Sequence, residues 1–172
     1  MTFILKTQRL YLREMTEIDA ENAFRLNSDP DVMRYTGDEL AENVQQMRVF
    51  LANYDAFAKY KMGRWAVIVA ETEEWLGWCG LKYHPETDEV DLGYRLLKSA
   101  WGKGYATEAA EICLIHGFET LDLKRIYAEA VEENTASIRV MQKLGMTLTE
   151  TKRTCAGYPS VIYEIFAVRK AF

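Results

Sequence analysis

Apolar and polar residues follow two different periods along this chain, and the periods predict strands and helices. Three segments, Arg64 to Ala70, Trp75 to Tyr83 and Glu89 to Leu97, are continuously apolar or alternate at a period of two, which is typical of strands. Pro85 and the polar residues after it predict the turn between the last two. Further strands are expected at Arg9 to Arg13, Lys124 to Val131, Thr147 to Arg153 and Val161 to Val168.

Helices are predicted where apolar residues recur every three or four positions. A long helix is expected from Glu39 to Lys61, and Ala106 to Phe118 carry the buried face of another. A third runs from Asn134 to Leu144 and is ended by Gly145. The earliest helix is expected from Thr16 to Asn27, with Thr16 and Asp19 as a capping box variant and Ile18, Ala23, Phe24 and Leu26 as packing residues.

The order of these elements places the chain in the α+β (α/β) class. It predicts a mixed, mostly antiparallel central sheet of about seven strands, with helices on its faces and a switch of direction at the strand–helix–strand unit. Ligands of such sheets bind where neighbouring strands diverge. Here that point is the carboxyl end of the strand Glu89 to Leu97.

A turn with two glycines, Gly102 and Gly104, lies between that strand and the following helix. The first N–H groups of a helix lack intrahelical partners, and glycine lets an anion approach the backbone, so the turn predicts a phosphate seat. Small residues chosen for helix packing are the alternative explanation. The turn is not a P-loop, because Gly104 follows Lys103 where Ser or Thr is needed, and Thr107 stands where the dinucleotide fingerprint needs a third Gly or Ala.

A second informative stretch opens the last helix. Asn134 is a good N-cap residue, and Ser137 lies three positions later, so both side chains are expected at the opening of the helix and on the same cleft. Capping explains Asn134 by itself, and a contact to a ligand is an additional role.

Composition narrows the class of protein. The chain has 172 residues, which fits a single domain spanning residues 1–172, and 49% of them are hydrophobic. A net charge of −5 argues against a broad nucleic-acid surface. Three cysteines, Cys79, Cys113 and Cys155, have no paired spacing, so we expect neither a disulfide framework nor a metal site, and a reducing, cytoplasmic location. No signal peptide and no membrane span are expected.

Several segments together resemble one enzyme family, the GNAT acyltransferases. Leu92-Gly93-Tyr94 followed by Gly102 to Ala109 resembles the family's acetyl-coenzyme A loop, and Asn134 to Met146 resembles its second motif. Thr7 to Arg13 and Asp29 to Met33 resemble the amino-terminal pattern of the branch that includes the RimJ/RimL-type acetyltransferases, which modify ribosomal-protein N-termini. The match covers most of the chain.

The resemblance implies acetyl-coenzyme A as the cofactor and strands that splay apart at its cleft. The pantetheine arm would lie beside the strand that ends at Leu96 and Leu97, with a backbone N–H near Leu96 aimed at the thioester carbonyl. Trp101 stands where the superfamily often has Gln or Arg, a change that backbone donors should survive. The remaining cofactor-binding residues would be Gly102, Lys103, Gly104, Tyr105, Ala106 and Thr107 at the pyrophosphate, together with Asn134 and Ser137.

The resemblance also implies two proton transfers. Ser137 holds the position of the acid that protonates the departing thiolate. Glu89 and Asp91, which alternate on one face of the central strand, are candidates for the base, and an ion-paired sheet face explains them equally well. Some relatives carry a later glutamate, where this chain has Thr154 and Cys155.

The predicted function is an N-acetyltransferase that transfers the acetyl group directly to a primary amine. Two acceptor classes remain open, a protein N-terminus and a small amine, and an acidic helical segment favours a cationic acceptor in either class. A coenzyme A-binding sensor or partner-binding module without turnover is the alternative, and a generic anion-binding domain is a third. Late edge strands are candidates for pairing in a homodimer. The acidic residues are Asp38, Glu39, Glu42 and Asp55.

Overall fold

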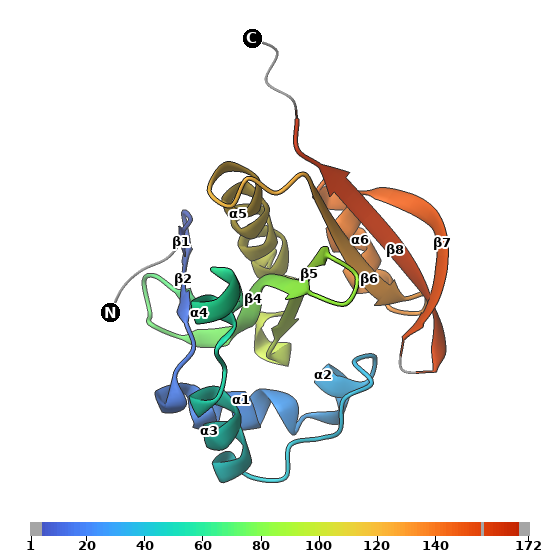
Figure 1. Ribbon diagram of the computed structural model, residues 1–172. Helices are drawn as coiled ribbons and strands as arrows, with labels where there is room; N and C mark the ends of the chain where they lie inside the picture. The colour runs from blue at the N-terminus through green and yellow to red at the C-terminus, as the bar shows by residue number, and fades with distance from the viewer. Residues whose placement is uncertain (1–4, 156, 169–172) are drawn as a thin grey trace.

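The structure, a computed structural model that describes residues 5–155 and 157–168, is built on one eight-stranded sheet. The strand order is β1-β2-β3-β4-β5-β6-β8-β7, and every neighbouring pair is antiparallel except β5 and β6, which are parallel (Figure 1). The strands are β1 (Leu5–Lys6), β2 (Leu10–Glu14), β3 (Arg64–Val69), β4 (Trp75–His84), β5 (Glu89–Leu96), β6 (Arg125–Val131), β7 (Thr147–Cys155) and β8 (Tyr158–Phe166).

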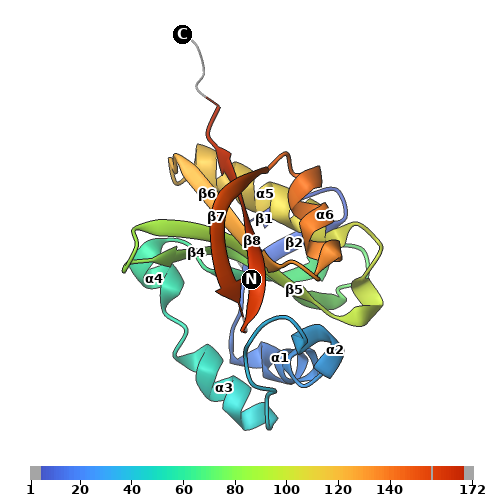
Figure 2. The ribbon, with the colours of Figure 1, turned by 90° about the vertical axis from the view of Figure 1, so that its right-hand side faces the viewer.

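Helices cover the two faces of the sheet separately. On one face α5 and α6 pack over the central strands, and on the other α1 packs against β3 and β4, with α2 and α3 beside it (Figures 1 and 2). The helices are α1 (Ala20–Asn27), α2 (Pro30–Met33), α3 (Val44–Ala52), α4 (Ala56–Tyr60), α5 (Tyr105–Glu119) and α6 (Thr135–Lys143), with short 3₁₀ turns η1 (Glu17–Asp19) and η2 (Lys98–Ala100).

Alternation along β5 separates the two faces. Val90, Leu92 and Leu96 are buried in the core beneath α5, so Asp91, Gly93 and Arg95 point to the opposite face. Helix α5 approaches this core closely at Gly117, where an added Cβ would lie 2.8 Å from Cδ1 of Ile126. Close packing of this helix fixes the position of its N-terminus, where the glycine turn begins.

The fold class and the mostly antiparallel sheet of about seven strands are confirmed, and two details of the sequence prediction are wrong. The sheet has eight strands because Leu5–Lys6 adds a short edge strand to β2. The expected helix from Glu39 to Lys61 is divided into α3 and α4, because Asn53 caps α3 and its side-chain amide donates to the Val49 carbonyl at 2.7 Å.

The second wrong detail concerns Ile18, which was expected to pack and is 83% exposed. The segment from Glu17 to Asp19 is a 3₁₀ turn and not the first turn of an α-helix, so the side chains there are rotated away from the predicted face. Asp19 is the buried residue of this turn, where Arg13 donates to both of its carboxylate oxygens.

Two further features bear on the expectations from composition. Cys79, Cys113 and Cys155 are free thiols, and the first two lie buried with their sulfur atoms 3.8 Å apart. Across residues 5–155 and 157–168, no helix combines the length and the apolar character that crossing a membrane requires.

Candidate active site

The glycine turn leads directly into α5 and presents a row of backbone N–H groups. Gly102 and Gly104 have φ values of 72° and 81°, in the left-handed region that favours glycine. The first N–H of α5 with an intrahelical partner is that of Glu108, which donates to the Gly104 carbonyl at 3.1 Å. Among the described residues, none of the six N–H groups from Gly102 to Thr107 makes a hydrogen bond of ordinary geometry.

The space over this turn is open. A Cβ added at Gly102 would meet no heavy atom within 4 Å, so the residue is required for its backbone angle and not because of crowding. At Gly104 the nearest atom to an added Cβ is the Arg9 Nη2, at 3.4 Å. Unpaired donors at the positive end of a 15-residue helix, with room above them, suit a phosphate group.

Side chains from the start of the chain hold the turn in place. Arg9 donates from Nε to a Glu108 carboxylate oxygen at 2.7 Å and from Nη1 to the Lys103 carbonyl at 3.1 Å, and its guanidinium lies over the Tyr105 ring. Thr7 donates to Glu108 at 2.6 Å. Burial by itself would raise the pKa of the Glu108 carboxyl, but the bonds from Thr7 and Arg9 bring that pKa below its ordinary value.

The sequence analysis missed the role of Arg9 and Glu108. The signal available was an acidic residue in the first turn of α5 that has no basic partner on its own helix.

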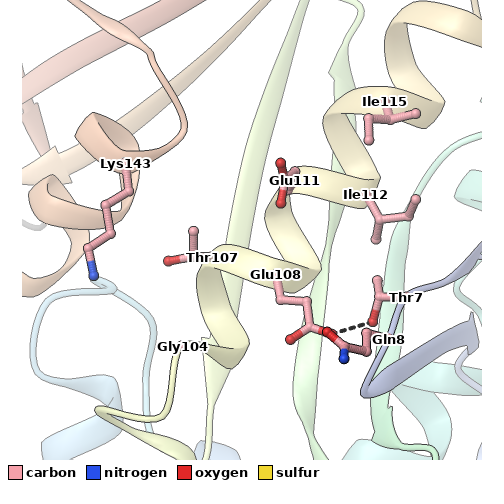
Figure 3. A pocket seen from close by; sticks show the side chains of 9 residues that line it. All are labelled: Thr7, Gln8, Gly104, Thr107, Glu108, Glu111, Ile112, Ile115 and Lys143. Atoms are coloured by element: carbon pink, nitrogen blue, oxygen red, sulfur yellow. Dashed lines mark hydrogen bonds between the residues drawn. The ribbon is translucent and has the colours of Figure 1, made fainter.

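A groove of about 590 Å³ lies beside the turn (Figure 3). In Figure 3 the side chain of Thr107 points from α5 toward α6, which carries Lys143. The other lining residues are Thr7, Gln8, Gly104, Glu108, Glu111, Ile112 and Ile115.

The strands β5 and β6 pair at one register position, between Asp91 and Tyr127. Beyond it toward the carboxyl ends, no further register pair joins the two strands in the described part of the chain. The edge of β5 from Gly93 to Leu96 is therefore paired with β4 on one side and free on the other. This is the divergence at which the sequence analysis placed the ligand.

The end of β5 shows which backbone groups face the divergence. The Leu97 N–H donates to the Leu76 carbonyl of β4 at 2.8 Å. Because successive residues of a strand direct their backbone groups to opposite edges, the N–H and carbonyl of Leu96 point away from β4. The Leu96 carbonyl accepts a hydrogen bond from the Trp101 indole at 2.9 Å, and its N–H remains directed at the divergence.

The start of α6 closes the site on the α5 side of the sheet. Asn134 caps the helix by accepting the Ser137 N–H at 3.2 Å, as its sequence predicted. The Tyr94 hydroxyl of β5 donates to Ser137 Oγ at 3.4 Å, so these side chains bridge the two diverging elements. Burial raises the pKa of the Tyr94 hydroxyl, which keeps it protonated. The sequence analysis missed Tyr94 as a site residue. Its place between Leu92 and Leu96, two positions from each, puts its side chain on the same face of the strand as theirs.

Glu89 and Asp91 lie on the opposite face, and both are held in ion pairs. Arg125 and Arg153 donate to Glu89 at 2.7 and 3.2 Å, and the Arg125 contact contributes most to lowering the pKa of that carboxyl. Arg64 binds Asp91 at 2.8 Å. Burial would raise the pKa of Asp91, but Arg64 and His84 bring it below the ordinary value. The structure therefore places both residues in the ion-paired face that was the alternative explanation.

Another carboxylate, Glu129, lies on the same face of β6. Its neighbours Ala128 and Ala130 are buried beneath α5, so Glu129 points to the opposite side. It accepts a hydrogen bond from the buried Ser160 hydroxyl and, within the described residues, forms no ion pair. After burial, the charges of Glu129 and Asp38 are the groups that raise the pKa of Cys155, so both carboxylates lie near that thiol. The sequence analysis missed Glu129, although its position in an alternating strand was visible.

A model of a known protein family matches most of this chain. The model described as the acetyltransferase (GNAT) domain covers residues 9–147. The chain belongs to the GNAT acetyltransferases. The predicted enzyme class is thereby confirmed, and the acceptor amine is left open.

Individual relatives support this assignment. The chain is 36% identical over 142 residues to the uncharacterized N-acetyltransferase p20 of Bacillus licheniformis, which covers 81% of this chain and 80% of that protein. A GNAT-family acetyltransferase of Bacillus anthracis superposes with a TM-score of 0.81 at 27% identity, covering 96% and 98% of the two chains. A spermidine N-acetyltransferase from Vibrio cholerae in complex with CoA and spermine shares the fold, with a TM-score of 0.76 at 18% identity over 93% and 96%.

Proposed function

We propose that this acetyltransferase transfers the acetyl group of acetyl-coenzyme A directly to a primary amine, with both substrates bound together, and that it belongs to the RimJ/RimL-type branch. The observation that carries the proposal is the row of unpaired N–H groups from Gly102 to Thr107 at the start of α5. The branch assignment rests on the sequence motifs of the amino-terminal segment.

The coenzyme's pyrophosphate would lie on this row of donors. The donors fit an anion because they are unpaired, converge at a helix N-terminus and have open space above Gly102. The adjoining groove, with Thr107 and Lys143 on its walls, offers a hydroxyl and a positive charge for the rest of the nucleotide. The solved GNAT neighbour with CoA bound supports the same choice of coenzyme.

The thioester end would lie against the free edge of β5. When bound, acetyl-coenzyme A supplies an activated acetyl group whose carbonyl oxygen gains negative charge as an amine attacks. The N–H of Leu96 faces the divergence and would donate to that oxygen, while Leu97 is engaged with β4. A donor in this position typically contributes a factor of about 10²–10³ to the rate.

Ser137 would protonate the departing sulfur. Its hydroxyl lies at the opening of α6 and is in contact with Tyr94, whose hydroxyl stays protonated because of burial. Ser137 would give its proton to the sulfur and regain one from Tyr94, which would be reprotonated by water, and no covalent intermediate would form on the enzyme.

We propose Glu129 as the group that receives the proton of the attacking amine. The predicted candidates Glu89 and Asp91 are held by arginines, which weakens them as bases, whereas Glu129 is held by a neutral hydroxyl. Its side chain points to the face of the sheet opposite α5, from which an acceptor would reach the divergence. Asp91 remains the second candidate.

The acceptor would be a cationic amine, because a carboxylate without a basic partner binds an ammonium group well. Asp38, on the segment between α2 and α3, is already paired with Arg95 at 2.7 Å, so Glu129 is the carboxylate proposed to attract the ammonium group. Within this class, a small polyamine and a protein N-terminus are both candidates, and the spermine bound to the solved neighbour favours the former.

The test is release of free thiol from acetyl-coenzyme A over a panel of polyamines, amino acids, aminoglycosides and peptides with varied first residues. We expect turnover with one class and a higher melting temperature with coenzyme A than with phosphate or ATP. Coenzyme binding without turnover on any amine would favour a sensor. Absence of both would refute the coenzyme seat.

A further inference from the structure

Trp101 makes a hydrogen bond that joins the two ends of the coenzyme site. Its indole Nε1 donates to the Leu96 carbonyl at 2.9 Å, and its own peptide leads into Gly102. The side chain is 49% exposed, so packing in the core does not explain its position. By contrast, the buried indole nitrogens of Trp65 and Trp75 have no partner among the described residues.

The residues between the two ends form a short loop that is fixed at several points. The Ala100 N–H donates to the Leu97 carbonyl at 2.9 Å, and the Trp101 N–H donates to the Lys98 carbonyl at 3.1 Å. These bonds shape η2, but neither reaches the free edge of β5. The indole bond alone, among the hydrogen bonds of the described residues, ties that edge at Leu96 to the residue that begins the glycine turn.

The spacing of these two ends matters because one molecule must reach both. The pyrophosphate seat and the thioester are linked by a pantetheine arm of fixed covalent length. If the turn moves relative to Leu96, an anchored phosphate leaves the thioester carbonyl misplaced from its N–H donor. Catalytic donors must lie about 2.7–3.1 Å from the developing oxyanion, so a small displacement lowers the rate.

We propose that Trp101 is a positioning residue whose indole N–H sets the distance between the phosphate turn and the Leu96 donor. The proposal rests on the proposed function. Trp101 acts on the rate step and not on coenzyme affinity, because the turn itself is held separately by Arg9 through the Lys103 carbonyl and Glu108.

The experiment compares Trp101→Phe with an isosteric replacement of Trp101 in which sulfur takes the place of the indole N–H. The single-turnover rate of acetyl transfer and the Kd for coenzyme A are measured for each. We expect both to lower the rate about three- to tenfold, the value of one hydrogen bond, and to change Kd less than twofold. Trp75→Phe is the matched control, because it removes an indole N–H that has no partner, and its rate should match the wild type.

Three results would overturn the proposal. A sulfur isostere with the wild-type rate would show that the hydrogen bond is irrelevant. A parallel loss of affinity and rate would make Trp101 an ordinary binding contact, and a gain in affinity would mean that the indole competes with the coenzyme for the Leu96 carbonyl. Melting temperatures show that each variant is folded, and a wild-type protein without turnover would refute the proposed function instead.

Discussion

The two faces of the sheet at β5 present different chemical groups, backbone on one face and side chains on the other. On the side of α5, the proposed coenzyme seat consists of backbone N–H groups at Gly102 to Thr107 and at Leu96, fixed by helix and strand geometry. On the opposite side, the proposed acceptor face consists of charged and polar side chains from segments far apart in the chain. These include Asn27, Asp38, Arg64, Asp91, Arg95, Glu129 and Arg153.

A site made of backbone N–H groups tolerates changes of its side chains, whereas a site made of side chains does not. Trp78 illustrates the second kind, since the guanidinium groups of Arg64 and Arg95 lie 5.2 and 5.3 Å from its ring centroid. Arg95 also binds Asn27 and Asp38, so one residue links the sheet, α1 and the segment before α3. Changes on the acceptor face should therefore affect rate and specificity, and changes in the turn should affect coenzyme affinity.

The largest effect is expected from Glu129→Gln. The amide keeps the size of the side chain and an oxygen that can accept from Ser160, but it cannot take a proton. We expect kcat to fall about 10²-fold or more with the Kd for coenzyme A unchanged, measured by thiol release and calorimetry.

Asp91→Asn is the comparison variant for the base. It leaves the partly buried Arg64 without its carboxylate, so stability should fall by about 2–3 kcal/mol while the folded protein keeps most of its kcat. If the Asp91→Asn protein is well folded but has no turnover and the Glu129→Gln protein is active, Asp91 and not Glu129 is the base.

A smaller loss is expected from Ser137→Ala. The variant removes the proposed acid, but Tyr94 lies close to the same position and can supply a proton through water. We expect kcat to fall about 10- to 100-fold, at or below the lower end of the usual range for a general acid. Tyr94→Phe together with Ser137→Ala should lose more than either change alone, and strictly independent losses in the double variant would contradict a shared path.

The coenzyme side is tested by a pair of glycine variants. Gly102→Ala and Gly145→Ala both place a side chain at a φ of 72–74° with no heavy atom within 4 Å, so each should cost about 1 kcal/mol of stability. Gly102→Ala alone should weaken coenzyme A binding, by about tenfold, because its methyl group occupies the anion's approach. Equal Kd values for coenzyme A in the two variants would show that the glycine turn is not part of the coenzyme site.

The sequence predicted the local backbone of the glycine turn and the cap of α6 well, because such features depend on short motifs. Gly102 and Gly104 are needed for their φ values, and Asn134 caps α6 as a short motif indicates. The predicted contacts to the coenzyme are still predictions. The proposed acceptor side has no such motif, since the pairing of Asp91 with Arg64 depends on strand register.

The helix prediction failed for a related reason. The apolar spacing from Glu39 to Lys61 continues through both α3 and α4, so periodicity does not reveal the break at Asn53. Next to the cap at Asn53, a distant contact also holds the chain, in which the Tyr54 hydroxyl accepts the Arg64 N–H of β3 at 2.8 Å. Long-range contacts of this kind decide boundaries that local pattern leaves open.

The smallest effect is expected from Glu108→Gln, which tests how the turn is held. The folded protein lowers the pKa of Glu108, so its bonds to Thr7 and Arg9 stabilise the fold above the unfolded pKa and are lost as pH falls through the folded pKa. At pH 7 the variant should be less stable by about 1 kcal/mol, and the difference should shrink below about pH 4. Glu119→Gln, at an exposed position of α5, is the control for melting curves between pH 3 and 7.

The central claim is that coenzyme A binds to the backbone of the glycine turn, and glycine amide NMR tests it most directly. In protein labelled with ¹⁵N at its 10 glycines, the amide peaks of Gly102 and Gly104 should shift on titration with coenzyme A. The peaks of Gly145 and Gly157, which lie outside the turn, should stay in place. Saturable binding that leaves Gly102 and Gly104 unmoved would contradict the claim.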